Sequence, residues 1–395
     1  MAAPLDVDRL RADTPGCSSV VHLNNAGSAL PPAVVTDTMV AHLRREELIG
    51  GYEAQAAASA AIDAVTSSAA RLVGARPEQI ALVESATAAW DRGLTTIRHT
   101  RGFRQGDRLL VSSAEYASNV LPLMQIAMST GARLEFVPDD ESGCIDVAAL
   151  AGMLDDDVAV VAITHCPSQN GLVNDIAAIG SLLADSDVWY LVDACQSVGQ
   201  LPVDAAAVGA DFLSVTGRKY HRGPRGTGFQ YASDEALDEL EPFPLDLHAA
   251  TWLTDGYEVQ PSARRFEYWE KSYAALLGLG AAIDYALDCG IDAIAGRIGE
   301  LAEYARDGLA DIPGVRVHDR GQQRSGIVTL TRDGIAAADL AAAVKAAGVN
   351  VSLSTPDYAR RDFDAHGVAG LVRVSPHAYN TPEEIDRMLA AVAGA

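Results

Sequence analysis

Near the middle of the chain, residues 188–196 read Val-Trp-Tyr-Leu-Val-Asp-Ala-Cys-Gln, an apolar run that ends in polar side chains. Because the run has no polar alternation, it predicts a strand that is buried on both faces of a parallel sheet. Asp193 and Gln196 follow the carboxyl end of this strand, and open parallel sheets bind their ligands beyond that end. The run therefore predicts both an α/β fold and the edge of the sheet at which its site lies.

Strands and helices alternate on both sides of this run. Apolar strands are predicted at 20–23, 80–83, 108–112, 134–137, 158–163, 212–215 and 228–231, and helices at 33–47, 53–73, 120–129, 147–154, 175–183 and 272–288, with one more opening at 84–90. Smaller elements follow, with helices at 291–309, 336–347 and 382–392 and strands at 315–318, 326–331, 349–353 and 371–375. We expect a large α/β domain over 23–289 and a small α+β domain over 290–395, against which an N-terminal segment over 1–22 packs.

Composition limits the classes of function. At 395 residues and 49% hydrophobic, the chain can bury a large core, and its net charge of −23 argues against a nucleic-acid surface. No apolar stretch approaches the ~20 residues that span a membrane. Asp6, Asp8 and Asp13 stand where a signal peptide would be basic and then apolar. Five scattered cysteines without a C-x-x-C spacing predict reduced thiols and no metal site. We expect a cytoplasmic protein that acts on a small molecule.

Lys219 is one of only three lysines, and it lies in the Ser/Thr- and Gly-rich loop 214–228, 26 positions after Asp193. A strand-end carboxylate followed by a lysine in such a loop matches the needs of pyridoxal 5′-phosphate (PLP), whose ring nitrogen takes a carboxylate and whose aldehyde takes an amine. The alternative is a solvated loop lysine in a chain whose lysine content reflects codon bias. The neighbouring Asp193 and Gln196 favour the cofactor.

Other polar loops are expected at the same edge of the sheet. Residues 85–87 open a helix and predict a phosphate cradle, although Ser and Thr also serve as ordinary helix caps. Tyr116 lies in loop 115–119 and can stack on a pyridine ring, although buried aromatic residues usually belong to the core. A further loop at 165–168 contains Ser168.

Three more side chains are candidates for contacts with cofactor or substrate. Gln196 can bond the phenolic oxygen of PLP, and Thr216 and Arg218 can reach its phosphate, although Arg218 is equally compatible with a surface charge. Arg373 lies on a predicted strand and can clamp an amino-acid carboxylate with two parallel hydrogen bonds; the alternative is a salt bridge to one of the 53 acidic residues. The glycines of 223–228 lack the G-x-G-x-x-G order and precede a strand, which excludes a dinucleotide-binding motif.

From residue 23 almost to the end, these motifs together resemble the class V aminotransferase family of fold-type I PLP enzymes, which includes the cysteine desulfurases. The resemblance implies a large domain with a mostly parallel seven-stranded sheet, a small α+β domain and a homodimer. It implies that Tyr116 stacks on the ring and that Asp193 and Gln196 bind it. Further implied contacts are Ala86, Thr87, Ser168, Thr216, Arg218 (in place of a usual His) and Lys219 with the cofactor, and Asn25, Ala26 and Arg373 with the substrate.

One departure from the family pattern concerns the reaction. Cysteine desulfurases carry a persulfide-forming cysteine on the loop before the carboxylate-binding arginine, whereas residues 352–370 of this chain contain none. Residues 217–228 and 265–270 resemble family members that cleave the C–S bonds of S-substituted cysteines, as in ergothioneine and sulfur-containing antibiotic pathways. We therefore predict a β-eliminating C–S lyase that uses Lys219, Asp193 and Tyr116. The alternatives are an aminotransferase, a decarboxylating relative, a cysteine desulfurase and a scaffold without turnover.

Overall fold

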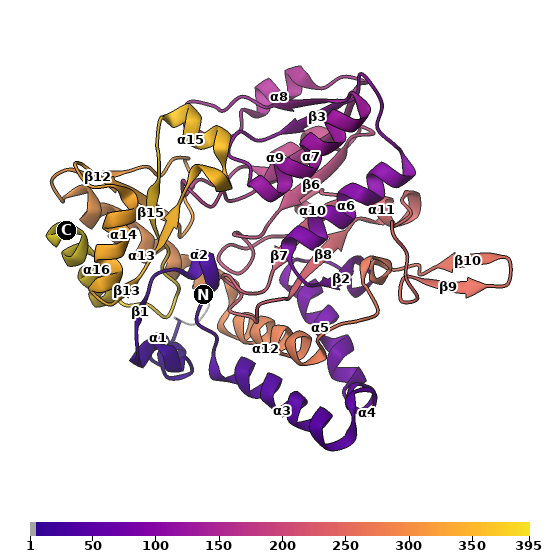
Figure 1. Ribbon diagram of the computed structural model, residues 1–395, viewed down its shortest axis with the longest axis horizontal. Coiled ribbons are helices and arrows are strands. Elements are labelled where there is room, and N and C mark those ends of the chain that lie inside the picture. The colour runs from indigo at the N-terminus through magenta and orange to yellow at the C-terminus, as the bar shows by residue number, and fades with distance from the viewer. Residues whose placement is uncertain (1–4) are drawn as a thin grey trace.

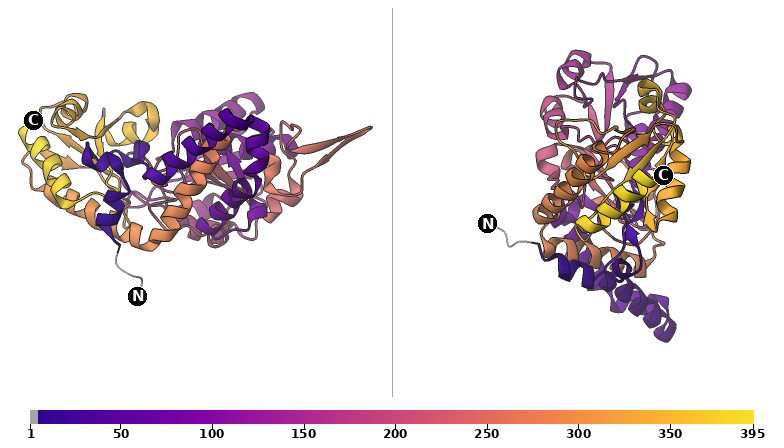
Figure 2. Two further views of the ribbon diagram at one scale, coloured as in Figure 1. Left: turned by 90° about the horizontal axis from the view of Figure 1, so that it is seen from below. Right: turned by 90° about the vertical axis from the view of Figure 1, so that its left-hand side faces the viewer.

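The computed structural model describes residues 5–395 and has a large and a small layered unit (Figures 1 and 2). A seven-stranded sheet with the order β2-β8-β7-β6-β5-β3-β4 forms the centre of the large unit. Its strands are β2 (Ile80–Val83), β3 (Arg108–Val111), β4 (Arg133–Phe136), β5 (Val158–Thr164), β6 (Trp189–Asp193), β7 (Phe212–Thr216) and β8 (Gly228–Ala232). Only β8 runs antiparallel to its neighbours, which confirms the predicted mostly parallel α/β sheet.

Helices cover both faces of this sheet, as continuous apolar strands require. On one face lie α5 (Ser59–Leu72), α8 (Val147–Met153), α9 (Ile176–Leu183), α10 (Ala205–Val208) and α12 (Tyr273–Cys289), and on the other α6 (Ala86–Thr100), α7 (Ala117–Thr130) and α11 (Asp234–Glu239). Successive residues of β6 serve opposite cores, because Tyr190 and Val192 pack with the first set and Trp189 and Leu191 with the second. The central run is therefore buried on both sides.

The small unit is built on a four-stranded antiparallel sheet with the order β11-β12-β15-β14. Its elements are α13 (Ile291–Ala310), β11 (Val315–Val317), β12 (Val328–Arg332), α14 (Ala337–Ala346), β13 (Val349–Asn350), β14 (Ser352–Ser354), α15 (Arg360–His366), β15 (Leu371–Val374) and α16 (Pro382–Gly394). Near the N-terminus, α1 (Val7–Ala12) is followed by β1 (Val21–His22), which pairs in parallel with β13. The domain boundaries at 22 and 289 stay a prediction, and residues 1–4 of the first segment lie outside the described residues.

Some elements differ from the expected ones. The helix predicted over 53–73 is two helices, α4 (Gly51–Ala57) and α5, separated at Ala58, and it follows α3 (Ala33–Ile49) and the short α2 (Asn25–Ser28). The strand predicted over 349–353 is divided between β13 and β14, which pair with different partners. Residues 250–259 form a hairpin of β9 (Ala250–Leu253) and β10 (Gly256–Val259) that projects away from the body (Figures 1 and 2). The sequence analysis missed it because nearly all of its residues are exposed.

No single helix among residues 5–395 has the length and apolar composition needed to cross a membrane. The two consecutive helices α12 and α13 meet that requirement only when taken together across a bend of 81°.

Candidate active site

A cavity of about 280 Å³ lies beyond the carboxyl ends of β5, β6 and β7. It brings together nine of the sequence-predicted residues, namely Ala86, Thr87, Tyr116, Ser168, Asp193, Gln196, Thr216, Arg218 and Lys219. These residues come from five separate segments at strand ends, and the parallel sheet assembles them because it directs those ends to one edge. A larger open groove of about 1060 Å³ is lined by a different set of residues, among them the helix-capping Asp146, Asp175 and Asp204.

Asp193 and Lys219 are both buried in this cavity, with 7% and 8% of their surfaces exposed. Asp193 ends β6, and its carboxylate accepts hydrogen bonds from Asn119 Nδ2 and from the backbone N–H of Cys195, each at 2.8 Å. Lys219 follows β7, and its Nζ lies 3.1 Å from Cys195 Sγ. The lysine loop crosses close to Gly199, where φ is +97° and a Cβ atom would lie 2.8 Å from the carbonyl carbon of Tyr220. Cys195 therefore contacts both groups, the carboxylate through its backbone N–H and the amine through its thiol.

One end of the cavity is suited to an anion. Ser85 caps α6 by accepting a hydrogen bond from Ala88 N at 3.1 Å, so Ala86 and Thr87 form the first turn of a 15-residue helix. Backbone N–H groups of a first helical turn and the helix dipole attract a phosphate. Arg218 adds a positive charge, and its Nη1 donates to Gly27 O at 2.7 Å.

Two buried polar atoms near the cavity have no partner within the described chain. Gln196 Nε2 donates to Ser168 Oγ at 3.0 Å and to Ala26 O at 3.1 Å, but its Oε1 is unpaired. Arg373 donates to Ser168 O at 3.2 Å and to Asn24 Oδ1 at 3.4 Å, but its Nε is unpaired. Because buried polar groups are normally satisfied, these two atoms indicate that the site binds a polar ligand.

Tyr116 precedes α7 at the mouth of the cavity and is half-buried. Its ring lies nearly parallel to that of Tyr358, at an interplanar angle of 7° and a centroid distance of 6.3 Å. Burial raises the pKa of the Tyr116 phenol, so this group is protonated at neutral pH. The short helical turn that carries Tyr358 belongs to the small unit, and the aromatic pair therefore joins the two units beside the site.

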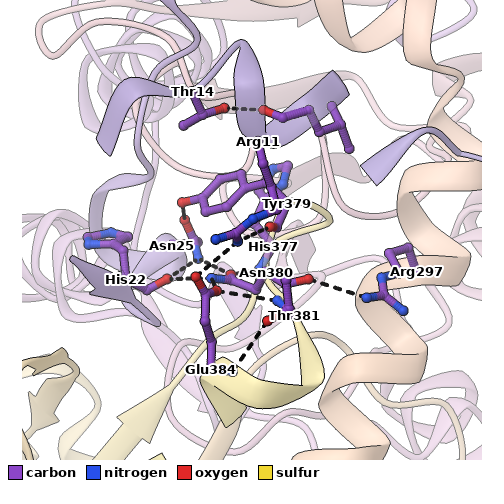
Figure 3. Close-up of polar contacts among 11 residues, drawn as sticks. Arg11, Thr14, His22, Asn25, Arg297, His377, Tyr379, Asn380, Thr381 and Glu384 are labelled. Atoms are coloured by element: carbon purple, nitrogen blue, oxygen red, sulfur yellow. Dashed lines mark hydrogen bonds and ion pairs between the residues drawn. The ribbon is translucent and has the colours of Figure 1, made fainter. Parts of the chain in front are cut away.

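The Asn25 side chain does not line the cavity, and its predicted contact with the substrate stays a prediction. The side chain is fully buried and donates to Ser375 O at 2.8 Å. It also accepts from the Tyr379 hydroxyl at 2.5 Å (Figure 3). Ala26 is nearer, because its carbonyl accepts from Gln196. Arg373 does not line the cavity and lies behind Ser168.

The network of Figure 3 ties the N-terminal segment to the turn before α16. Arg11 donates to Glu384 Oε1 at 2.9 Å, and Asn380 Nδ2 donates to Glu384 Oε2 at 2.7 Å. Beside it, His377 Nε2 lies 3.0 Å from the carbonyl oxygen of Tyr220, the residue after Lys219. Asn25 therefore helps to hold the N-terminal segment against the small unit, and His377 contacts the lysine loop.

The sequence analysis did not single out Asn119, Glu115 or Cys195, although the first two lie in the polar loop that it identified. Asn119 contacts both Asp193 and the buried carboxyl group of Glu115. Burial raises the pKa of Glu115 to about 7. Glu115 lies just before α7 and Asn119 lies in its first turn, so their closeness in the sequence was the available signal.

Comparison with known proteins agrees with this arrangement. The model of the family described as "Aminotransferase class-V" matches residues 21–388. The chain belongs to the class V aminotransferase family. A probable cysteine desulfurase of Halobacterium salinarum is 29% identical over 409 residues, which cover 98% of this chain and 96% of that protein. The structure of a cysteine desulfurase from Thermococcus onnurineus has a TM-score of 0.90 at 25% identity and covers 100% of this chain and 99% of that one.

A second group of class V structures shares the fold. The structure of the cystine C–S lyase C-DES has a TM-score of 0.86 at 22% identity, covering 96% of this chain and 99% of that one. In another structure of C-DES, a lysine mutant, glycine is linked covalently to the PLP cofactor. This chain is accordingly a PLP-dependent enzyme of the class V family.

The residues present fit PLP. The Lys219 amine would bind the aldehyde, the Asp193 carboxylate would pair with the ring nitrogen, and the first turn of α6 would bind the phosphate. The unpaired Gln196 Oε1 and the guanidinium of Arg373 would bind polar groups of the cofactor and of an amino-acid substrate.

Proposed function

We propose that the enzyme is a C–S lyase that acts by β-elimination on an S-substituted L-cysteine or its sulfoxide. The substrate loses its Cα proton and its sulfur substituent, which leaves as a thiol or a sulfenate. Hydrolysis of the remaining three-carbon unit by one water molecule gives pyruvate and ammonia. No electron acceptor and no substrate other than water are needed, because the loss of a proton from Cα and of the sulfur group from Cβ involves no net oxidation or reduction.

The observation that carries this proposal is the composition of the loop that precedes Arg373. Residues 352–370 contain no cysteine, and the loop presents Tyr358 to Tyr116 beside the cavity. A desulfurase needs a thiolate to take the sulfur atom from its substrate. An aromatic side chain in this place supports a reaction in which sulfur leaves with a small molecule.

The thiols of the cavity support the same conclusion. Cys166 and Cys195 both line it, but burial raises the pKa of each thiol above its usual value. The nearby Lys219 lowers the pKa of Cys195, yet burial is the larger influence. Both groups are therefore protonated at neutral pH and are poor nucleophiles.

Different residues of the site would carry out the separate steps of the elimination. Bound PLP supplies an electron sink for the negative charge that develops at the substrate Cα. The Lys219 amine takes the Cα proton, and the Asp193 carboxylate holds a proton on the ring nitrogen. The Arg373 guanidinium orients the substrate by its carboxylate. Tyr116 lines the cavity, and Tyr358 lies nearly parallel to it.

An aminotransferase would use the same residues to remove the Cα proton but would return a proton to the cofactor instead of expelling the sulfur group from Cβ. A decarboxylating enzyme would use them to release carbon dioxide from Cα. The curated relatives named cysteine desulfurases make desulfuration a third candidate. The absent loop cysteine argues against the third candidate, and the first two stay alternatives.

The test is a screen of S-substituted cysteines and their sulfoxides with pyruvate as the readout. We expect one pyruvate per released sulfur compound, without a keto-acid acceptor and without a persulfide on the protein. Alanine formation together with a persulfide on Cys166 or Cys195 would establish a desulfurase instead. Turnover that requires a keto acid and yields no pyruvate would establish an aminotransferase.

We also propose that the enzyme is a homodimer. The support is the apolar surface of the β9–β10 hairpin, where Trp252 is 91% exposed and Leu253 and Tyr257 are also exposed. An isolated two-stranded hairpin is marginally stable in water, so a second copy that packs against it would stabilise it. Light scattering on the purified protein gives the mass, and a monomeric mass would refute the proposal.

A further inference from the structure

Glu115 has one of the most fully enclosed carboxyl groups near the site, with 3% of the residue exposed. Its Oε2 accepts hydrogen bonds from Ser112 Oγ at 2.6 Å and from Thr164 N at 2.9 Å. Its Oε1 accepts from the Thr164 hydroxyl and from Asn119 Nδ2, the latter at 2.7 Å. The Tyr116 backbone N–H adds a longer contact to Oε1 at 3.4 Å. A buried carboxyl group is costly, and four close donors directed at one group indicate a specific use.

Asn119 connects this carboxyl group to the catalytic edge of the sheet. Its Nδ2 donates to Glu115 Oε1 at 2.7 Å and to Asp193 Oδ2 at 2.8 Å. A side-chain amide nitrogen carries two hydrogens, so these two bonds use both of them. Only the nitrogen end of the amide can face two carboxyl groups, and Glu115 therefore determines which way Asn119 is turned.

The other oxygen of Asp193 is held by the backbone N–H of Cys195 at 2.8 Å. Asp193 is thus held by one bond from its own loop and one from Asn119, a side chain on α7. If Asn119 turned over, its carbonyl oxygen would face the carboxylate, and two acceptors would repel each other. The Asp193 side chain would then lose one of its two fixed contacts.

We propose that Glu115 is a positioning residue for the PLP reaction, which acts through the Asn119 amide to hold the Asp193 carboxylate in place for the cofactor. Glu115 does not need to touch PLP or the substrate. Its contribution is to the geometry of the pair that Asp193 forms with PLP, because a charge-assisted hydrogen bond weakens when its acceptor is free to move. The proposal rests on the cofactor role of Asp193 and not on the lyase reaction.

The experiment compares Glu115→Gln, Asn119→Ala and the double variant, using PLP titration of the apo protein followed by absorbance. In Glu115→Gln, an NH₂ group replaces one of the two carboxyl oxygens that accept these hydrogen bonds. The Asn119 amide then no longer has a fixed acceptor, and its orientation is lost. We expect the dissociation constant of PLP to rise about tenfold in each single variant, the effect of one weakened charge-assisted hydrogen bond. With any substrate that is turned over, kcat should fall by a similar factor while KM changes by less than about twofold.

The double variant gives the decisive result. If Glu115 acts through Asn119, the double variant should bind PLP no more weakly than Asn119→Ala alone. Additive losses would show that the two side chains act independently and would overturn the proposal. Wild-type affinity for PLP in Glu115→Gln would overturn it as well. Should Glu115→Gln fail to fold, Asn119→Ala still decides, because unchanged PLP affinity in that variant removes the connection.

Asp211→Asn is the matched control. Asp211 is a half-buried carboxyl group that accepts from a backbone N–H (Tyr190, 2.8 Å) and a hydroxyl (Ser233, 2.9 Å), and desolvation raises its pKa to about 6. It lies at the opposite end of the sheet, beside the start of β7. We expect this variant to lose stability but to keep its PLP affinity. The PLP titration requires no substrate, so it remains valid if the lyase reaction is not observed.

Discussion

The strand ends that carry Asp193 and Lys219, here called the floor of the cavity, are built differently from the loop that carries Tyr358. Asp193 and Lys219 follow strands that are hydrogen-bonded on both sides, and both residues are more than nine-tenths buried. Tyr358 lies on a short turn of the small unit and is 46% exposed. The floor has the residues expected of the class V family, whereas the loop lacks the desulfurase cysteine. The difference suggests that the sheet determines the cofactor chemistry and that the loop selects the reaction, because loops tolerate substitution better than paired strands.

Replacing the amine of the floor should have the largest effect. Lys219→Ala should abolish the covalent attachment of PLP and lower kcat by at least about a thousandfold, because the chain loses its nucleophile and its base together. Borohydride reduction of the wild-type protein followed by peptide mapping should place the label on Lys219. A label on Lys271 or Lys345 would contradict the role given to the floor.

The carboxylate of the floor should rank second. Asp193→Asn should lower kcat by about a hundredfold or more, because a neutral amide cannot hold a proton on the ring nitrogen. The variant should fold and bind some cofactor, as monitored by circular dichroism and by the absorbance of bound PLP. Unchanged turnover would remove Asp193 from the mechanism.

Arg373 lies between the two regions, on β15 of the small unit but hydrogen-bonded to Ser168 of the large one. Arg373→Ala should raise KM about tenfold or more with a smaller change in kcat, because it deletes a carboxylate clamp that serves ground state and transition state alike. PLP affinity should stay at the wild-type value. Loss of PLP without a change in KM would show that Arg373 belongs to the cofactor site.

Substitution in the loop should have a modest effect of a different kind. Tyr358→Ala removes the stacked partner of Tyr116 and should change kcat/KM by about three- to tenfold, to a different extent for different sulfur substituents. Kinetics with a matched pair of aromatic and aliphatic S-substituents would measure this preference, and Tyr358→Phe is the control that keeps the ring. Equal losses for both substrates would assign Tyr358 a structural role only.

The smallest expected effect is on how the free energy of unfolding depends on pH, and it involves a histidine close to Lys219. His221, two residues after Lys219, is buried, and burial lowers its pKa to about 4. The unfolded chain binds a proton at this residue between about pH 6.5 and 4 that the folded chain does not, so the free energy of unfolding falls as pH decreases through that window. His221→Phe should flatten this slope by up to about 1.4 kcal/mol per pH unit. Urea unfolding at pH 7.5 and pH 5 checks it, and an unchanged slope would contradict the assignment.

The sequence alone predicted the α/β sheet, the family and the cofactor. The sheet and the cofactor depend on short-range patterns, namely apolar runs that fit buried strands and polar residues that follow them directly, and the family follows from the resemblance of these motifs to known enzymes. The same patterns missed the β9–β10 hairpin, whose exposed residues have no apolar period, and they merged α4 with α5 because nothing in the apolar pattern separates the two helices. The roles given to individual site residues stay predictions until the variants are measured.

The side-chain contacts around the site were decided only by the tertiary structure. Asn119 meets Asp193 across 74 positions of sequence, and the Tyr379 hydroxyl meets Asn25 across 354. No local pattern predicts which of many polar side chains will meet at such separations, since that depends on how the sheet and the two units pack. The sequence therefore determined that Asp193 and Lys219 stand at the ends of neighbouring strands. Packing decided that Asn119 and Glu115 support Asp193, that Tyr358 stacks against Tyr116, and that Asn25 belongs to the framework and not to the cavity.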